Sequence, residues 1–165
     1  MGAMAHPEPL FHTADMVRDL LQEDRAWPRY ETLYGELAVT PAPRSIHQWL
    51  ASELLVELTL YLRRYPLGAA YMSPADISWG RPDVLVQPDV FVVPREQARR
   101  SHAGESWKAV RHLMLAVEVV SPESGGRDRF GKRVLYQRQR VDRYWVIDAD
   151  RRVAEGWTPD ATEPE

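Results

Sequence analysis

One apolar segment of the chain carries a single acid in its middle. Leu113–Val120, LMLAVEVV, is otherwise continuously hydrophobic, and this pattern is typical of a strand that is buried on both faces of a sheet. An ionised carboxylate in such a strand is unfavourable unless it has a cation, a proton or a cleft that opens onto water. Glu118 is therefore the first candidate functional residue.

Periodicity and turn residues predict alternating strands and helices along the rest of the chain. After the apolar strand, Ser121-Pro122 ends the segment, a basic helix is expected over 127–140, and 143–147 is again apolar. A helix between two apolar strands is the pattern of a right-handed βαβ crossover. The other expected elements are a helix over 14–24, a strand pair or a bent strand over 29–40, a helix over 45–64, and strands over 71–79, 84–93 and 153–157. The segment over 95–111 is expected to be polar and irregular, with room for one helical turn.

The predicted helix over 45–64 has the strongest helical periodicity in the chain. Ser45 is expected to cap it. Its apolar residues recur at helical spacing, which predicts a stripe that packs in the core. These residues are Trp49, Leu50, Leu54, Leu58 and Tyr61.

Length and composition predict one globular domain. The chain has 165 residues, of which 44% are hydrophobic and 27% charged, enough for a single core. We expect this domain over 13–157, after a tag scar and disordered N-terminus over 1–12 and before an acidic disordered tail over 158–165. No segment has the length of a membrane span or the pattern of a signal peptide, so a cytoplasmic location is expected.

The chain has no cysteine, which excludes disulfides, thiolate zinc sites and cysteine nucleophiles. Any metal must be held by oxygen or imidazole ligands, and this favours hard cations such as Mg²⁺ or Mn²⁺.

Charge is distributed unevenly, although the net charge is only −3. Residues 1–37 carry seven acids and three arginines, whereas 123–143 carry seven basic residues and three acids. The basic stretch directly follows the strand that contains Glu118. Only two of the 21 basic residues, Lys108 and Lys132, are lysines.

A second carboxylate is a candidate partner of Glu118. Asp89 immediately precedes the β-branched run VFVV, and two acids at the ends of adjacent strands suit Mg²⁺, which takes one or two carboxylates and fills its other positions with water and phosphate oxygens. Such an ion activates water and polarises a phosphodiester, which is nuclease chemistry. Two structural alternatives remain open: Glu118 as half of a buried ion pair, and Asp89 as a turn residue, as expected for the similar Pro82-Asp83-Val84.

The predicted basic helix can bring a cation to this pair. Asp128, Lys132 and Tyr136 follow one another at intervals of four and so share a helix face. Beside the scissile phosphate, the Lys132 ammonium would stabilise the transition state. The alternative is a solvated ion pair between Asp128 and Lys132, worth a few tenths of a kcal/mol.

These residues carry a family resemblance. The segments QPDVFVV and LAVEVVSPESGGRDRFGKRVLYQRQRVDRYWVID, with YGELAVTPAPRSIHQ before them, resemble the Uma-two family of predicted endonucleases in the PD-(D/E)XK superfamily. The resemblance covers residues 29–157. It implies an α/β (α+β) fold with a restriction-endonuclease-like core, in which a central mixed β-sheet is flanked by helices. It also implies that Asp89 and Glu118 are metal ligands.

The resemblance has one departure at the site. The superfamily's E-x-K would place a lysine at position 120, where this chain has Val120. The resemblance implies that Lys132 on the following helix supplies the third catalytic group. It also places Glu36 and His47 at family positions, and two alternatives stay open for them: supporting residues of the site, beside Asp128 and Tyr136, or structural roles.

The function expected from the sequence is a Mg²⁺- or Mn²⁺-dependent endonuclease that acts on nucleic acid, with DNA favoured over RNA and no membrane partner. Cutting both strands of a duplex takes two sites, so a homodimer is plausible by analogy. The alternative is a degenerate nuclease fold that acts as a nucleic-acid-binding or protein-interaction module, because a fold does not determine a function.

Overall fold

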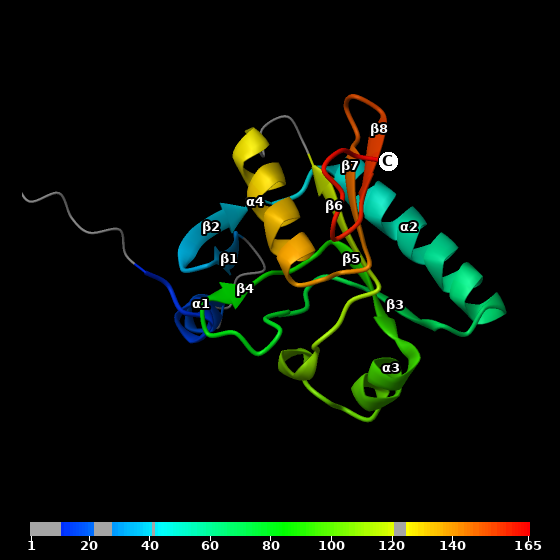
Figure 1. Cartoon of the computed structure of the whole chain (residues 1–165), viewed down its shortest axis with the longest axis horizontal. Coiled ribbons are helices and arrows are strands. Elements are labelled where there is room, and N and C mark those ends of the chain that lie inside the picture. Colours follow the sequence, from blue (N-terminus) through cyan, green and yellow to red (C-terminus); the bar gives the residue numbers. More distant parts are fainter. Residues whose placement is uncertain (1–10, 22–27, 41, 121–124) are drawn as a thin grey trace, which may run out of the picture.

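Two β-sheets and the helices around them make up the chain (Figure 1). The computed structural model describes residues 11–21, 28–40, 42–120 and 125–165. The helices are α1 (Ala14–Leu21), α2 (Ser45–Arg64), α3 (Arg95–His102) and α4 (Gly125–Arg138), with a 3-10 turn at Trp107–Ala109. The strands are β1 (Arg29–Leu33), β2 (Glu36–Thr40), β3 (Gly68–Met72), β4 (Val84–Leu85), β5 (Val90–Pro94), β6 (Leu115–Val120), β7 (Arg143–Asp148) and β8 (Val153–Trp157).

The larger sheet is mixed and has the order β3-β5-β6-β7-β8. Its one parallel pair is β6 with β7, which α4 connects, as the apolar–helix–apolar pattern predicts. β6 is the middle strand and is buried along nearly its whole length, because α2 packs on one face of the sheet and α4 lies over the other. The expected fold, a central mixed sheet flanked by helices, is confirmed.

The smaller sheet is antiparallel, with the order β2-β1-β4. β1 and β2 form the hairpin expected around Tyr34-Gly35, and Gly35 adopts a φ of 87° that favours glycine. α1 packs against β1 and β4, where Val17 and Leu85 are fully buried. β1 of this sheet contacts α4 near its middle, where Lys132 pairs with Glu31, and Figure 1 shows the small sheet beside that helix.

The single strand predicted over 84–93 is wrong. The segment forms β4 in the small sheet and β5 in the large sheet, with Gln87, Pro88 and Asp89 between them. Pro88 has no N–H for a ladder, and the Ser73 hydroxyl donates to the carbonyl oxygens of Gln87 and Pro88, at 3.1 and 2.7 Å. The chain therefore leaves one sheet and enters the other directly beside Asp89. The strand predicted over 71–79 also ends early, at Met72.

The prediction for α2 is correct in its bounds but not in its buried face. Arg44, not Ser45, occupies the N-cap position and makes no side-chain cap. Ala51 and Leu62 are buried against the large sheet. Trp49 and Tyr61, which the sequence analysis assigns to the core, are more than half exposed. The helical period of 3.6 residues defines a wide apolar stripe on α2. It does not determine which edge of that stripe packs against the sheet.

Residues 158–165 are not the disordered tail that their acidic composition predicts. Glu165 exchanges two backbone hydrogen bonds with Gly156 in β8, and the Gln137 amide donates to the carbonyl oxygens of Thr158 and Ala161. Arg140 pairs with Asp160, and Arg143 pairs with Glu165. Two of the three acids of this segment are thus matched by basic residues that follow Glu118. The segment over 95–111, predicted as irregular with one helical turn, contains more helix than expected, namely α3 and the 3-10 turn at Trp107–Ala109.

Within the described residues, no helix has the length and apolar character that crossing a membrane requires.

Gly68 is expected to be a stability determinant of the large sheet. A Cβ at this position would overlap the carbonyl oxygen of Val93 on the neighbouring β5, so Gly68→Ala should cost about 1–3 kcal/mol of unfolding free energy. Gly131→Ala is the control, because its Cβ would meet Leu33 at 3.6 Å, an ordinary contact, and alanine favours a helix by up to about 1 kcal/mol. Denaturant melts of both variants test this. Equal stability of the two would contradict the close approach of β3 and β5.

Candidate functional site

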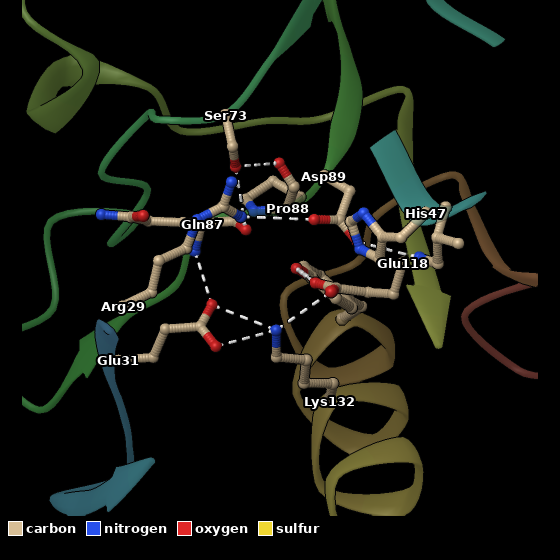
Figure 2. A network of polar contacts seen from close by, with 11 residues as sticks. Arg29, Glu31, His47, Ser73, Gln87, Pro88, Asp89, Glu118 and Lys132 are labelled. Atoms are coloured by element: carbon tan, nitrogen blue, oxygen red, sulfur yellow. Dashed lines mark hydrogen bonds and ion pairs between the residues drawn. The ribbon is translucent and has the colours of Figure 1, made fainter. Parts of the chain in front are cut away.

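Three buried carboxylates from three parts of the fold face one cavity. Glu31 comes from β1, Asp89 from the segment that enters β5, and Glu118 from β6 (Figure 2). Their residues are only 2%, 6% and 6% exposed, and all three line a cavity of about 200 Å³. Buried acids so close together need specific cationic or hydrogen-bonding partners.

Asp89 and Glu118 oppose each other across two paired strands. Val90 of β5 pairs with Val117 of β6 in antiparallel register, and one further step places Asp89 opposite Glu118. Directly opposed residues point to the same face, with Cβ atoms about 4.5–5.5 Å apart. The backbone N–H of Val119 donates to Asp89 Oδ2 at 2.9 Å, which fixes this carboxylate against β6. Two acids far apart in the sequence thus meet on one face, as the sequence analysis expects.

Asp89 is held as an anion. Arg29 lies 3.2 Å from its Oδ1, and His47 Nε2 lies 3.0 Å from its Oδ2. Burial alone would raise the pKa of the Asp89 carboxyl, but the hydrogen bond and charge of His47, the Lys132 charge and the Val119 N–H together lower it below its ordinary value. His47 reaches this position from the first turn of α2.

Glu118 has a different environment. Its Oε2 lies 3.0 Å from the Lys132 ammonium, and Tyr136 donates a hydrogen bond of 2.8 Å to its Oε1. Burial is the largest influence and raises the pKa of Glu118 to about 7, aided by the charges of Asp89 and Glu31 and opposed by Lys132 and Tyr136. This carboxyl is therefore poised between its protonated and ionised forms near neutral pH.

Lys132 lies between two of the acids. Its Nζ is 2.8 Å from a Glu31 oxygen and 3.0 Å from a Glu118 oxygen. Burial works to lower the pKa of the ammonium, but the Glu118 and Glu31 carboxylates outweigh burial and raise it, so Lys132 is a permanent cation. α4 delivers it to the cavity that Val120 also lines. The helix thus supplies the ammonium that a lysine at position 120 would otherwise bring.

Glu31 is a site residue that the sequence analysis misses. Besides binding Lys132, its Oε1 accepts the backbone N–H of Gln87 at 2.7 Å, so it also holds the segment that carries Asp89. Arg29, Glu31 and Leu33 are every second residue of β1 and therefore point to one face of the strand. All three line the cavity. An acid inside a predicted strand is the same signal that identifies Glu118.

The predicted supporting residues have different outcomes. His47 and Tyr136 contact Asp89 and Glu118 directly. Glu36 is exposed at the β1–β2 hairpin and, of the described residues, is not among those that line the cavity. The side chain of Asp128 lies outside the described part of the chain. The structure thus brings Asp89, Glu118 and Lys132 together, and their catalytic role stays a prediction.

The opposed pair of acids fits a magnesium or manganese ion. Both carboxylates supply hard oxygen donors to one cavity, and Asp89 and Glu31 charges disfavour ionisation of Glu118, a repulsion that a cation would relieve. Three or more acidic or histidine side chains do not gather into a metal-holding cluster in the part of the chain that the structure describes. Mg²⁺ needs no such cage, since it binds through one or two carboxylates and keeps several waters.

Comparison with known proteins identifies a matching family and a solved structure with a similar fold. A family model described as "Uma2: Putative restriction endonuclease" matches residues 15–165. Among solved structures, the fold is similar to that of a putative nuclease belonging to DUF820 from Anabaena variabilis ATCC 29413, with a TM-score of 0.73 and 20% sequence identity over 93% of this chain and 83% of that chain. No curated protein sequence matches the chain.

Proposed function

Because this chain belongs to the Uma2 family of restriction-endonuclease-like proteins, we propose that it is a divalent-metal-dependent endonuclease that hydrolyses phosphodiester bonds in DNA. The observation that supports this best is the opposition of Asp89 and Glu118 in one cavity, with the Lys132 ammonium 3.0 Å from Glu118. Acids for a metal and a cation for a phosphate thus share a single site.

Each residue of the site has a defined task in this proposal. Asp89 and Glu118 would hold the Mg²⁺ or Mn²⁺ ion, which lowers the pKa of a bound water and polarises the phosphodiester when it is present. Lys132 stabilises the charge that develops on the phosphate oxygens. Arg29 and His47 hold Asp89 in its ionised form, and Tyr136 orients Glu118. Burial and the nearby Glu118 and Glu31 charges raise the pKa of the Tyr136 hydroxyl well above 10.0, so it stays a donor.

One observation favours a second function. Each of the three acids already has a cationic partner within the chain, namely Lys132 for Glu31 and Glu118, and Arg29 for Asp89. Because these ion pairs are internal to the chain, the cluster would be stable without a metal. The second candidate is therefore a nuclease fold that binds nucleic acid or protein and does not cleave.

Asp89→Asn is the variant that tests the proposed function. We expect the wild-type protein to nick or cut DNA with Mn²⁺ or Mg²⁺ and not with chelator, and we expect Asp89→Asn to lose this activity because the amide is a neutral and weaker ligand. Gel assays on plasmid, single-stranded DNA and RNA measure it. Asp83→Asn is the matched control: Asp83 follows a proline and precedes a valine as Asp89 does, but it pairs with Arg81 in an exposed turn.

The outcomes separate the candidates. Metal-dependent cleavage that Asp89→Asn loses and Asp83→Asn keeps supports the nuclease. Cleavage of RNA alone would overturn the assignment of DNA as substrate. Binding of nucleic acid without cleavage at any metal concentration would favour the second candidate.

A further inference from the structure

α2 has a second apolar face, which points away from the sheet. Trp49, Val56 and Leu60 are 57%, 52% and 53% exposed, and Ile46 at the helix start is 38% exposed. The opposite side of the same helix packs on the large sheet through residues such as Ala51 and Leu62. Figure 1 shows α2 along the rim of the fold, with no described element over its outer side. An apolar patch of this kind on a helix indicates an interaction surface.

The spacing of this face is that of a helix-pairing seam. Ile46, Trp49, Glu53, Val56, Leu60 and Arg63 follow one another at alternating intervals of three and four residues, the repeat that places side chains along one line of contact between two helices. We call these six residues the α2 seam. Its two charged members, Glu53 and Arg63, are exposed and flank the apolar pair Val56 and Leu60.

The α2 seam is complementary to itself when it is reversed. We propose that two copies of this chain dimerise by packing their α2 seams antiparallel about a two-fold axis. In this arrangement Val56 of one copy meets Leu60 of the other, and Glu53 meets Arg63, each contact occurring twice. A parallel arrangement would instead oppose Glu53 to Glu53 and Arg63 to Arg63, which charge repulsion disfavours. The order of charges along the seam thus selects both the partner and its direction.

The antiparallel arrangement also gives the ends of the α2 seam an apolar contact. Beyond the Glu53–Arg63 contact, Trp49 would pass the end of the partner's helix, where Leu67 of this chain is 54% exposed. His47 lies on the other side of α2, where it contacts Asp89. Of the seam residues only Ile46, at the start of the helix, also lines the cavity, and the central contacts Val56–Leu60 and Glu53–Arg63 lie further along α2 and leave the cavity open. The proposal is therefore independent of whether the site cleaves DNA.

Charge reversal at the seam provides the test. Sedimentation velocity over a concentration series should show a dimer for wild type. Glu53→Arg alone and Arg63→Glu alone should each weaken dimerisation by at least about tenfold, because each creates two like-charge contacts in the symmetric dimer. The double variant Glu53→Arg/Arg63→Glu restores both contacts and should dimerise as wild type does.

Mixing the two single variants gives a sharper result. One variant has only basic residues at the two charged seam positions and the other only acidic residues, so the mixture should form a heterodimer although neither variant dimerises well alone. The control is Glu96→Arg with Arg99→Glu on α3, an exposed pair on another helix, which should change nothing. Thermal melts verify that each variant is folded.

Three results would overturn the proposal: a monomeric wild type at all concentrations, single reversals that dimerise as wild type does, or a mixture that stays monomeric. Failure of dimerisation would leave the metal-dependent cleavage assay untouched, so the two proposals fail separately.

Discussion

Lys132→Met is expected to lower the DNA cleavage rate at least about 100-fold, a loss comparable to that from removing one transition-state hydrogen-bond donor in other enzymes. Methionine keeps a long unbranched side chain but loses the ammonium that lies 2.8 Å from Glu31 and 3.0 Å from Glu118. DNA affinity should change little, because one cavity lysine contributes little to the total of phosphate contacts. Single-turnover cleavage and a binding titration in Ca²⁺ measure the two quantities separately.

The same variant should also lose stability when metal is absent. Removing the Lys132 ammonium leaves the buried Glu31 and Glu118 carboxylates without their cationic partner. In a buried ion-pair network such a loss lowers the free energy of unfolding by about 3–5 kcal/mol. Mn²⁺ should recover part of this loss, because it binds the folded state and neutralises the same acids. Lys108→Met is the matched control, since Lys108 is the other lysine of the chain and is exposed in the 3-10 turn. Wild-type turnover in Lys132→Met would remove Lys132 from the mechanism.

The two acids of the proposed metal site could be predicted because each stands out in the local sequence pattern. Glu118 interrupts an apolar strand, and Asp89 starts another. Lys132 follows from helical spacing and from the scarcity of lysine. Glu118 and Lys132 lie on one topological element, the β6–α4–β7 crossover, whose apolar strands and basic helix are evident from periodicity. Asp89 meets them through the antiparallel pairing of β5 with β6.

What could not be predicted depends on contacts between distant segments. Glu31 carries the local signal of an acid inside a strand, but nothing local in RYETL specifies the pairing of β1 with β4 in the small sheet that brings it to Gln87 and Lys132. The division of 84–93 between two sheets likewise follows from tertiary packing at Pro88. Trp49 and Tyr61 of α2 were assigned to the core because periodicity gives the faces of a helix, not which face meets the sheet.

Glu118 holds the most consequential position in this network, because it belongs to both the ion pair and the proposed metal site. If Lys132 depended on it alone, Glu118→Gln would strand a buried ammonium and cost about 3–5 kcal/mol. However, Lys132 keeps Glu31 at 2.8 Å, and the substitution also relieves the repulsion from Asp89 and Glu31. We therefore expect metal-free Glu118→Gln to be as stable as wild type at neutral pH, or more stable.

The pH dependence gives this expectation a definite sign. The pKa of Glu118 is raised to about 7 in the folded protein from its ordinary value of 4.5, so the folded state binds more protons than the unfolded state over that range. Glu118 therefore stabilises the metal-free fold fully below pH 4.5, and this contribution is lost as pH rises through about 7. Asp89, whose pKa is lowered from 3.8, acts in the opposite direction and only in more acidic solution.

Glu118→Gln should consequently flatten the decline of metal-free stability between pH about 5 and about 8. It should also abolish the stabilisation by Mn²⁺, which for wild type should increase with pH because the ion and the proton compete for the same carboxylate. Denaturant melts of both proteins at these two pH values, with chelator and with Mn²⁺, measure both effects. Glu57→Gln on the exposed side of α2 is the control and should match wild type throughout. A large loss of stability in chelator together with a retained Mn²⁺ response would show that Glu118 is a structural ion-pair partner and that the metal, if one binds, is held elsewhere.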